Sequence, residues 1–349
     1  MQNTDQKTKI LVYGVLGYTG SLFVEQALDK RIPIVLAAMQ HEVKNVSAKY
    51  GIEYRIFEIS DVQHIVACLS DVKAVINLAN VSFGINRHLI EACIQTKTHY
   101  VDLAAEYPDI LEIYKLHHEA FANGVMLMSG AGFNLAPTDI AGRLASEGLP
   151  DSEKLFLGFA TFGTASRGTI KTVLKLATAT GYSRVSGDLI ISNPPFERRL
   201  FRADGKNYNL IHNPLMGDSL TGFITTKIGT IATYSYYPWI LIQFMQGRMN
   251  WLRKFLFRYS TFFFPLGPTR DELAKQYTYT WAQAENKHNQ KLIVTIKGPQ
   301  AYLFTVKIIG RIIGQLAVNN TYPGFTPPAV YGRSLIDGIE GVQISIEEH

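Results

Sequence analysis

Short apolar runs alternate with segments of helical periodicity over roughly the first 130 residues of the chain. The predicted strands cover residues 10–13, 34–38, 54–57, 74–78, 100–103 and 125–128, and the predicted helices between the later strands cover 62–69, 86–96 and 109–123. Strands and helices in alternation predict a doubly wound parallel sheet in an α/β fold. Ligands of such sheets bind beyond the carboxyl ends of the strands, so a site is expected in the segments that follow them.

The first predicted strand leads straight into the glycine-rich turn GVLGYTG and then into a helical segment, SLFVEQALDK. In this context the glycines permit a tight turn, close approach of the backbone to a pyrophosphate and close packing of the helix on the strand. The helix start adds N–H groups and the positive end of a dipole. The pattern predicts a Rossmann dinucleotide-binding domain whose contacts here are Gly14, Leu16, Gly17, Tyr18, Thr19 and Gly20.

The second strand should end on the residue that reads the adenosine ribose. That residue is acidic for NAD, whereas an arginine there binds the 2′-phosphate of NADP. This chain offers neither, but has Met39, Gln40 and His41, with Lys44 one turn later. The missing carboxylate favours NADP, with NAD as the open alternative. Further candidate cofactor contacts after the third and fourth strands are Asp61, Ala79 and Asn80.

The second half of the chain changes to longer β-rich runs from about residue 158. A helix is predicted to open near residue 169, and residues 277–285 and 291–297 predict a hairpin with His288 and Asn289 in its turn. These elements predict a separate α+β domain.

Residues 219–270 contain no Asp or Glu. Helical periodicity there places Trp251, Leu252, Phe255, Leu256, Tyr259, Phe262 and Phe263 on one face, opposite Asn250, Arg253, Lys254 and Arg258. A basic amphipathic helix rich in Trp and Phe is typical of a membrane interface, so peripheral membrane contact is one interpretation. Packing on the domain core or in a homodimer is the other. The preceding apolar run contains Pro238 and is too short to span a bilayer.

Composition narrows the class of protein. A length of 349 residues suits about two domains, and 47% hydrophobic residues provide material for globular cores. A net charge of +5 is too small to indicate nucleic-acid binding. The polar start MQNTDQKTKI lacks the apolar run of a secretory signal, so a cytoplasmic location is expected. No metal site is expected, because the histidines and the two cysteines, Cys68 and Cys93, show no ligand spacing.

Three segments together carry a family resemblance: VYGVLGYTG, EACIQTKTHYVDLAAE and SGAGFNLAPTDIAG. They resemble the saccharopine dehydrogenase-like oxidoreductases, and most of all their trans-acting enoyl reductase branch. The closing segments LGPTRDELAKQ and FTPPAVYGRSLIDGIEGVQISI are similar to that branch as well, whereas residues 189–264 match poorly. Two positions depart from the family: Met39 stands where Arg is usual, and Asn134 where Asp is usual.

The resemblance implies an NADP-binding Rossmann domain, a second α+β domain that carries the substrate site or a dimer interface, and a C-terminal segment that returns to the first domain. The expected bounds are 1–145, 146–315 and 316–349, with an apolar insert at about 219–270. It also implies hydride transfer, with Asn80 near the nicotinamide ribose.

A hydride transfer requires orientation of the cofactor and a proton donor for the developing anion. Tyr100, Asp102 and Glu106 lie at a predicted strand end and are the candidate catalytic residues. Tyr100 and Asp102 lie two residues apart in a strand, so they share a face and can instead form a structural contact. Asp139 follows Pro137 at a predicted helix start, where a capping role is favoured.

The predicted function is an NAD(P)-dependent oxidoreductase that transfers a hydride to an enoyl or carbonyl group of a hydrophobic, acyl- or lipid-linked substrate. Two alternatives stay open. One is a non-catalytic nucleotide sensor or membrane-associated scaffold. The other is an amino-acid-linked reductase of the saccharopine type, which would need cations such as Arg143, Arg167 and Arg184 to hold carboxylates.

Overall fold

A computed structural model describes residues 7–79, 83–177, 179–192 and 197–349 of the chain. It divides into two compact units, which differ from the expected domains in their bounds. Unit 1 contains residues 1–132 and 305–330, and unit 2 contains residues 133–304 and 331–349. The helix α7 (Ala136–Gly148) packs on the sheet of unit 2, so the division falls before it rather than after residue 145. Residues 331–349 belong to unit 2 because their strand β16 (Gln343–Glu348) pairs with that unit's sheet.

Unit 1 is built on a seven-stranded sheet in the order β15-β6-β5-β4-β1-β2-β3, and all of its pairs are parallel. The strands are β1 (Lys9–Tyr13), β2 (Ile34–Ala38), β3 (Tyr54–Ile56), β4 (Val72–Asn77), β5 (His99–Asp102), β6 (Met126–Met128) and β15 (Gly324–Phe325). The strand order reverses between β1 and β4, and ligands of doubly wound sheets bind at such a point. The predicted Rossmann arrangement is therefore confirmed, and it directs attention to the ends of these two strands.

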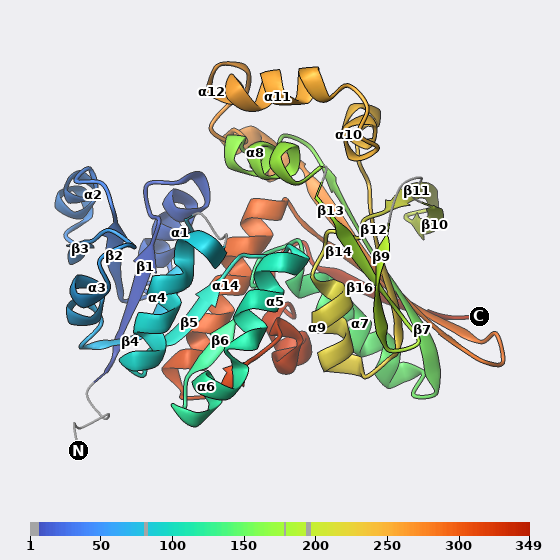
Figure 1. Cartoon of the computed structure of the whole chain (residues 1–349), viewed down its shortest axis with the longest axis horizontal. Coiled ribbons are helices and arrows are strands. Elements are labelled where there is room, and N and C mark those ends of the chain that lie inside the picture. Colours follow the sequence, from blue (N-terminus) through green and yellow to red (C-terminus); the bar gives the residue numbers. More distant parts are fainter. Residues whose placement is uncertain (1–6, 80–82, 178, 193–196) are drawn as a thin grey trace. The chain divides into compact units, whose positions relative to one another are not determined.

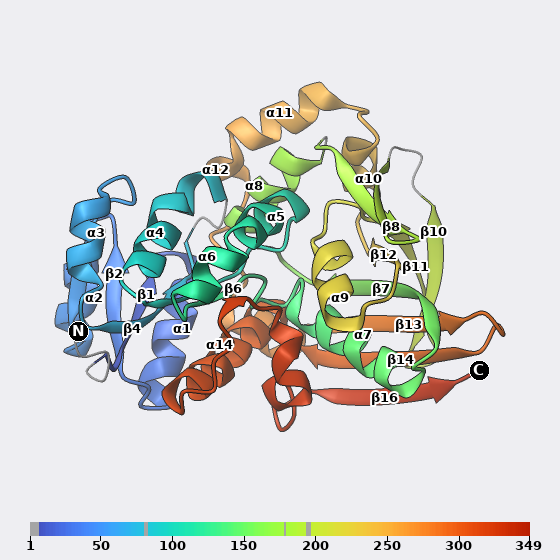
Figure 2. The ribbon, with the colours of Figure 1, turned by 60° about the horizontal axis from the view of Figure 1, so that its bottom comes forward.

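Helices cover both faces of this sheet. They are α1 (Tyr18–Asp29), α2 (Val43–Tyr50), α3 (Val62–Cys68), α4 (Phe83–Gln95), α5 (Tyr107–Lys115), α6 (His117–Ala122) and, from residue 305 on, α14 (Ala301–Ala317). Figure 2 shows α3, α4 and α5 on one face and α1 and α14 on the other. The Gln26 amide of α1 donates to the Val306 carbonyl of α14 at 2.7 Å, which fixes the late helix against the early one.

Unit 2 is built on a nine-stranded mixed sheet, with the path β10-β11-β12-β7-β13-β14-β16 and with β8 paired to β12 and β9. Its strands besides β16 are β7 (Ser152–Phe162), β8 (Gly181–Val185), β9 (Asp188–Ser192), β10 (Arg198–Ala203), β11 (Lys206–His212), β12 (Thr230–Ser235), β13 (Tyr277–Asn286) and β14 (Lys291–Pro299). The predicted hairpin is the β13–β14 pair. The strands β12 and β7 are parallel and the other pairs are antiparallel, as expected of an α+β unit.

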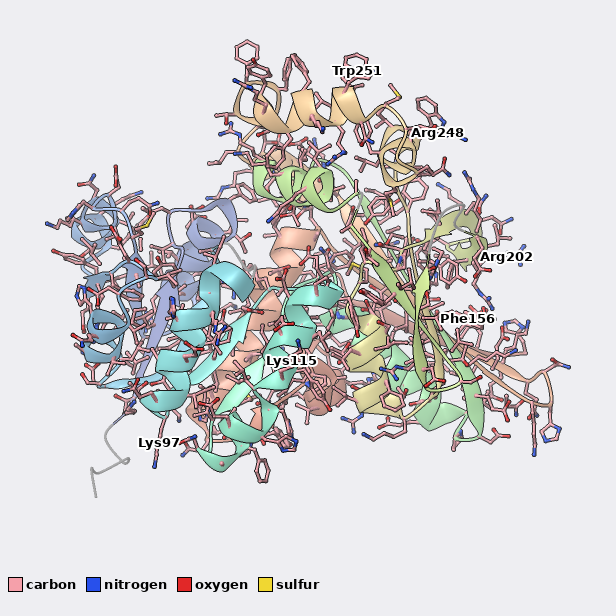
Figure 3. All side chains as sticks on the ribbon, in the orientation of Figure 1. Lys97, Lys115, Phe156, Arg202, Arg248 and Trp251 are labelled. Atoms are coloured by element: carbon pink, nitrogen blue, oxygen red, sulfur yellow. The ribbon has the colours of Figure 1, made fainter. Side chains whose placement is uncertain are left out.

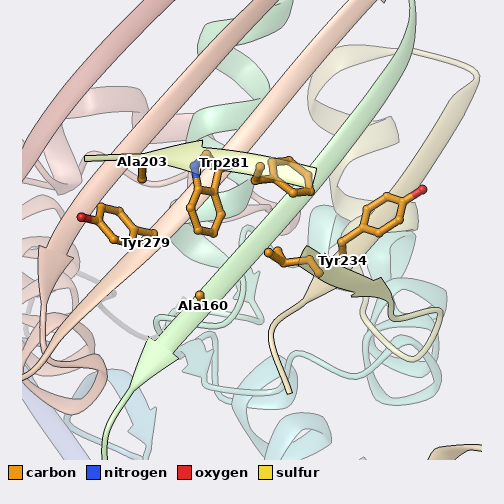
Figure 4. Packing of buried hydrophobic residues seen from close by; sticks show 7 residues of the cluster. Ala160, Ala203, Tyr234, Tyr279 and Trp281 are labelled. Atoms are coloured by element: carbon orange, nitrogen blue, oxygen red, sulfur yellow. The ribbon is translucent and has the colours of Figure 1, made fainter. Parts of the chain in front are cut away.

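The two faces of the unit 2 sheet differ. The helices α7 and α9 (Asp218–Thr226) pack on one face (Figure 1). On the other face the strand β10 crosses the sheet above Trp281 (Figure 4). The Trp281 indole N–H donates to the Arg202 carbonyl at 2.8 Å, and its ring lies 5.4 Å from those of Phe201 and Tyr279. The aromatic side chains on this face form a buried apolar cluster.

The expected insert at 219–270 is not a single structural feature. Its first part forms most of α9 and all of β12, which are core elements of unit 2. Only α10 (Trp239–Met245), α11 (Asn250–Arg258) and α12 (Ser260–Phe263) stand apart from the sheet, over α8 (Arg167–Leu176), and α13 (Arg270–Lys275) leads back into β13 (Figure 1). Within the described ranges, no helix is both long enough and apolar enough to cross a membrane.

Candidate functional site

The turn between β1 and α1 requires glycine at two of its three glycine positions. Gly14 has a φ of +88°, and a Cβ there would lie 2.5 Å from the Ala79 amide nitrogen. A Cβ at Gly20 would lie 2.2 Å from the Gly14 carbonyl oxygen. The Gly17 amide donates to that same oxygen at 3.0 Å, which closes the turn. Ala79 and the glycine turn, both predicted to contact the cofactor, therefore lie against each other.

This turn fits a pyrophosphate group. Gly17 occupies the position before α1 and has no side chain to cap the helix. Gly17 is exposed, and Leu16, Tyr18 and Thr19 are half-buried around it. A helix start approached through side-chain-free backbone offers N–H groups and a positive dipole end to an anion.

The other predicted cofactor contacts lie in different surroundings. Met39 is half-exposed and Gln40 is exposed, and both directly follow β2, the strand next to β1. Asp61 caps α3, where its carboxylate accepts the His64 amide at 3.0 Å, so part of its hydrogen-bonding capacity is used locally. Asn80 lies outside the described residues.

A buried hydrogen-bond chain joins the carboxyl ends of β4, β5 and β6. The Asn77 amide group donates to the Tyr100 hydroxyl at 3.0 Å, and that hydroxyl donates to Asp102 Oδ2 at 3.0 Å. The other oxygen of Asp102 accepts the Ser129 hydroxyl at 2.5 Å and the Ala104 amide at 3.0 Å. All four side chains are fully buried, so the chain fixes three strand ends from within.

The same network reaches the glycine turn. Asn77 Oδ1 accepts the Ala79 amide at 3.1 Å, and Ala79 is the residue against which Gly14 packs. Tyr100 and Asp102 do share a face, as their spacing predicts, but with no exposed surface they hold the loops rather than face an open site. Sequence reasoning missed Asn77, whose only signal is an amide side chain at the end of an apolar strand.

Burial raises the pKa of both acidic members of this network. The pKa of Asp102 rises to about 7 because the carboxylate is cut off from water, although the hydrogen bonds from Ser129, Ala104 and Tyr100 oppose the rise. The pKa of Tyr100 lies well above its ordinary value, first because of burial and then because of the neighbouring Asp102 charge. Ionisation of Asp102 in this buried place therefore costs free energy.

The remaining two proton-donor candidates lie in different units. Glu106 is partly exposed, precedes α5 in unit 1, and accepts the Ala105 amide at 3.2 Å. Asp139 is buried in the first turn of α7 in unit 2, where it accepts the Thr225 hydroxyl at 3.1 Å. Leu135, not Asp139, holds the cap position of α7. Only Glu106 joins partial exposure to a place beside the strand ends of unit 1.

Comparison with known protein families identifies the kind of domain that unit 1 contains. Residues 10–128 match the model of the saccharopine dehydrogenase NADP-binding domain. The matched segment includes the glycine turn, Met39 and the Asn77–Tyr100–Asp102 chain. No curated protein matches the sequence. On the domain match, the chain is an NAD(P)-dependent oxidoreductase with an NADP-binding domain.

Solved structures extend the likeness in fold to nearly the whole chain. Saccharopine dehydrogenase (L-Glu forming) from Saccharomyces cerevisiae aligns with a TM-score of 0.62 at 12% identity, covering 98% of this chain and 100% of that one. A probable dehydrogenase from Thermotoga maritima aligns with a TM-score of 0.45 at 10% identity, covering 94% and 93% of the two chains. The first of these shows that the chain shares the fold of a saccharopine dehydrogenase.

Replacing Met39 by Arg is expected to raise the affinity of the NADP-binding domain for NADPH by about tenfold, because a guanidinium at this strand end can bind a 2′-phosphate through charged hydrogen bonds. NADH affinity should not change. Titration of nicotinamide fluorescence measures both, and Met39→Leu is the matched control. An equal gain for NADH and NADPH would show that Met39 does not lie near the 2′-position.

Proposed function

We propose that the chain reduces an enoyl or carbonyl group of a hydrophobic, acyl-linked substrate, the chemistry of the enoyl reductase branch that its sequence resembles. NADPH supplies the hydride when it is bound. The chain's own part is to hold the pyrophosphate at Gly14, Gly17 and Gly20, to keep the strand ends rigid through the buried Asp102 network, and to supply a proton.

The observation that carries the choice of substrate class is an aromatic cluster on the sheet of unit 2. Phe162 lies at its centre, with ring distances of 5.2 Å to Tyr277, 5.4 Å to Tyr208 and 5.5 Å to Tyr236. Phe162, Tyr208 and Tyr277 are half-buried and Tyr236 is exposed, so the cluster offers aromatic surface at the protein boundary. Such a surface suits an apolar chain better than a charged substrate.

Glu106 is the proposed proton donor. A general acid must reach the reacting group, and neither Tyr100 nor Asp102 has exposed surface. Glu106 follows β5, the strand beside β4, and it is partly exposed at the carboxyl end of the sheet. In this arrangement Tyr100 and Asp102 position the loop that leads to Glu106.

An amino-acid-linked reductase is the second candidate, favoured by the fold shared with saccharopine dehydrogenase. Such a substrate needs cations that are free to bind carboxylates. Arg143 pairs with Glu147 at 2.7 Å, Arg167 donates to the Phe264 carbonyl at 3.0 Å, and Arg184 donates to the Ser219 carbonyl at 2.8 Å. Each guanidinium thus has a partner within the protein, on three different elements, which supports the hydrophobic substrate instead.

Following NADPH oxidation separates these candidates. With enoyl and keto thioesters, the rate is expected to rise with acyl length, and Glu106→Gln should lower kcat by about 100-fold with unchanged NADPH affinity. Glu119→Gln, an exposed glutamate on α6, is the matched control. Oxidation with glutamate-linked substrates alone would favour the amino-acid-linked reductase. NADPH binding without oxidation by any of these substrates would favour a nucleotide sensor.

A further inference from the structure

The apolar side chains of α11 lie on two sides of the helix, although the sequence pattern places them on a single face. Leu252 and Leu256 turn inward and pack with Leu174 of α8. Arg253 also turns inward, because its guanidinium donates to the Leu174 carbonyl at 2.6 Å. Two of the seven apolar residues predicted for this face are therefore part of the core packing.

The opposite side of α11 is exposed, and with α10 and α12 it forms what is here called the outer aromatic face. The exposed fractions are 86% for Phe262, 72% for Trp251 and 65% for Trp239. Figure 3 shows Trp251 projecting from α11 on the side away from α8. The other exposed apolar side chains of this face are Phe255, Phe257, Tyr259, Phe263 and Leu266. The ring of Phe255 lies 4.9 Å from that of Tyr259 and 5.7 Å from that of Phe263, and Phe263 lies 5.4 Å from Phe262, so these four rings are in contact with one another.

Cations accompany this surface, and the segment that forms it contains no Asp or Glu. The prediction that Lys254 and Arg258 lie opposite Trp251 is wrong. Both are exposed and share the outer side of α11 with Trp251, because residues three and seven positions apart lie on the same side of a helix. Arg248 is exposed in the turn just before α11 (Figure 3). Residues 219–270 contain no acidic side chain to neutralise them.

We infer that the outer aromatic face docks on the surface of a lipid bilayer that contains anionic lipids. Exposed Trp and Phe beside Lys and Arg suit the interface between acyl chains and anionic headgroups, where rings are buried and cations meet phosphate. A second copy of the chain fits this face less well. In a two-fold interface the same cations would oppose one another without a carboxylate to pair with.

The inference does not depend on the proposed reaction, and vesicle binding tests it directly. Full-length protein is floated with phosphatidylcholine vesicles and with mixed phosphatidylcholine–phosphatidylserine vesicles. Wild type should prefer the anionic vesicles. The double variant Trp251→Ser/Phe262→Ser should lose at least about tenfold in binding. Lys254→Glu/Arg258→Glu should lose about fivefold or more per cation, and on the anionic vesicles only.

Matched controls lie elsewhere on the exposed surface. Phe121→Ser removes a ring that is 62% exposed on α6, and Lys287→Glu reverses an exposed charge in the β13–β14 turn. Both should bind as wild type does. Equal binding of the double variants and wild type would overturn the inference, as would no binding of wild type to either vesicle. A wild-type dimer that dissociates in Trp251→Ser/Phe262→Ser, without vesicle binding, would assign the face to a second copy.

Discussion

Gly17→Asp is expected to abolish NADPH binding without unfolding the protein. A carboxylate at this position would stand at the start of α1, where we propose that the pyrophosphate is held. At about 4 Å and an effective dielectric constant near 20, one like-charge contact costs about 4 kcal/mol, which corresponds to a loss of about 1,000-fold in affinity. High salt should recover part of that loss, since charges near the surface are screened.

The geometry of Gly17 separates this loss from misfolding. Its φ of −77° suits any L-residue, and a Cβ there would meet only the Gly14 carbonyl oxygen, at 3.3 Å. Asp is also a favourable residue before a helix. The melting temperature should therefore hold or rise. Gly314→Asp, in open space on α14, is the control and should bind NADPH normally. Unchanged affinity in Gly17→Asp would remove the cofactor from this turn.

Asp102→Asn is expected to destabilise the protein by about 2–4 kcal/mol at pH 5. The amide nitrogen in place of Oδ2 cannot accept from the Tyr100 hydroxyl, as a carboxyl oxygen can in either protonation state, and it adds a buried N–H. Each donor left unpaired in a buried place costs about 1–3 kcal/mol. Urea unfolding measures the change. Asp29→Asn, an exposed aspartate at the end of α1, should stay within about 0.5 kcal/mol of wild type.

The penalty of Asp102→Asn should shrink as pH rises. The pKa of Asp102 is about 7 in the folded chain, above the value of about 3.9 for an unfolded aspartate. Between these values the folded state binds the extra proton, so wild type loses up to about 4 kcal/mol as pH rises through this window. The asparagine variant has no such proton to lose. A penalty equal at pH 5 and pH 8 would contradict a raised pKa at this site.

Local sequence patterns predicted the first half of the fold well, because each of its strands and helices is short and carries its own hydrophobic pattern. The strands β2 and β5 match their predicted bounds to within one residue at each end. The strand β15 could not be predicted, since two residues carry no periodicity. Its place beside β6 also depends on a pairing between residues far apart in the chain. The same holds for β16, whose partner β14 decides to which unit the end of the chain belongs.

The candidate site likewise has parts that a contiguous stretch of sequence predicts and parts that depend on residues far apart in the chain. The glycine turn is contiguous in the chain, so the sequence alone could identify it as a candidate site, and the spacing of Tyr100 and Asp102 predicted a shared face. The buried partners of the pair are Asn77 at the end of β4 and Ser129 just after β6, which lie far from it in the sequence. On α11, periodicity identified an amphipathic helix but could not show which apolar residues contact α8 and which face solvent. That division depends on the tertiary packing of α8 against α11.

The return of the chain to the first sheet has a consequence for how the protein forms during translation. The strand β15 and the helix α14 are synthesised long after β6 and α1, the elements on which they pack. Until then a nascent chain that emerges from the ribosome carries β6 as an open edge and α1 with an uncovered side. The dinucleotide-binding unit can therefore be completed only near the end of synthesis, and a fragment that stops at residue 132 should be a client for chaperones rather than an independent domain.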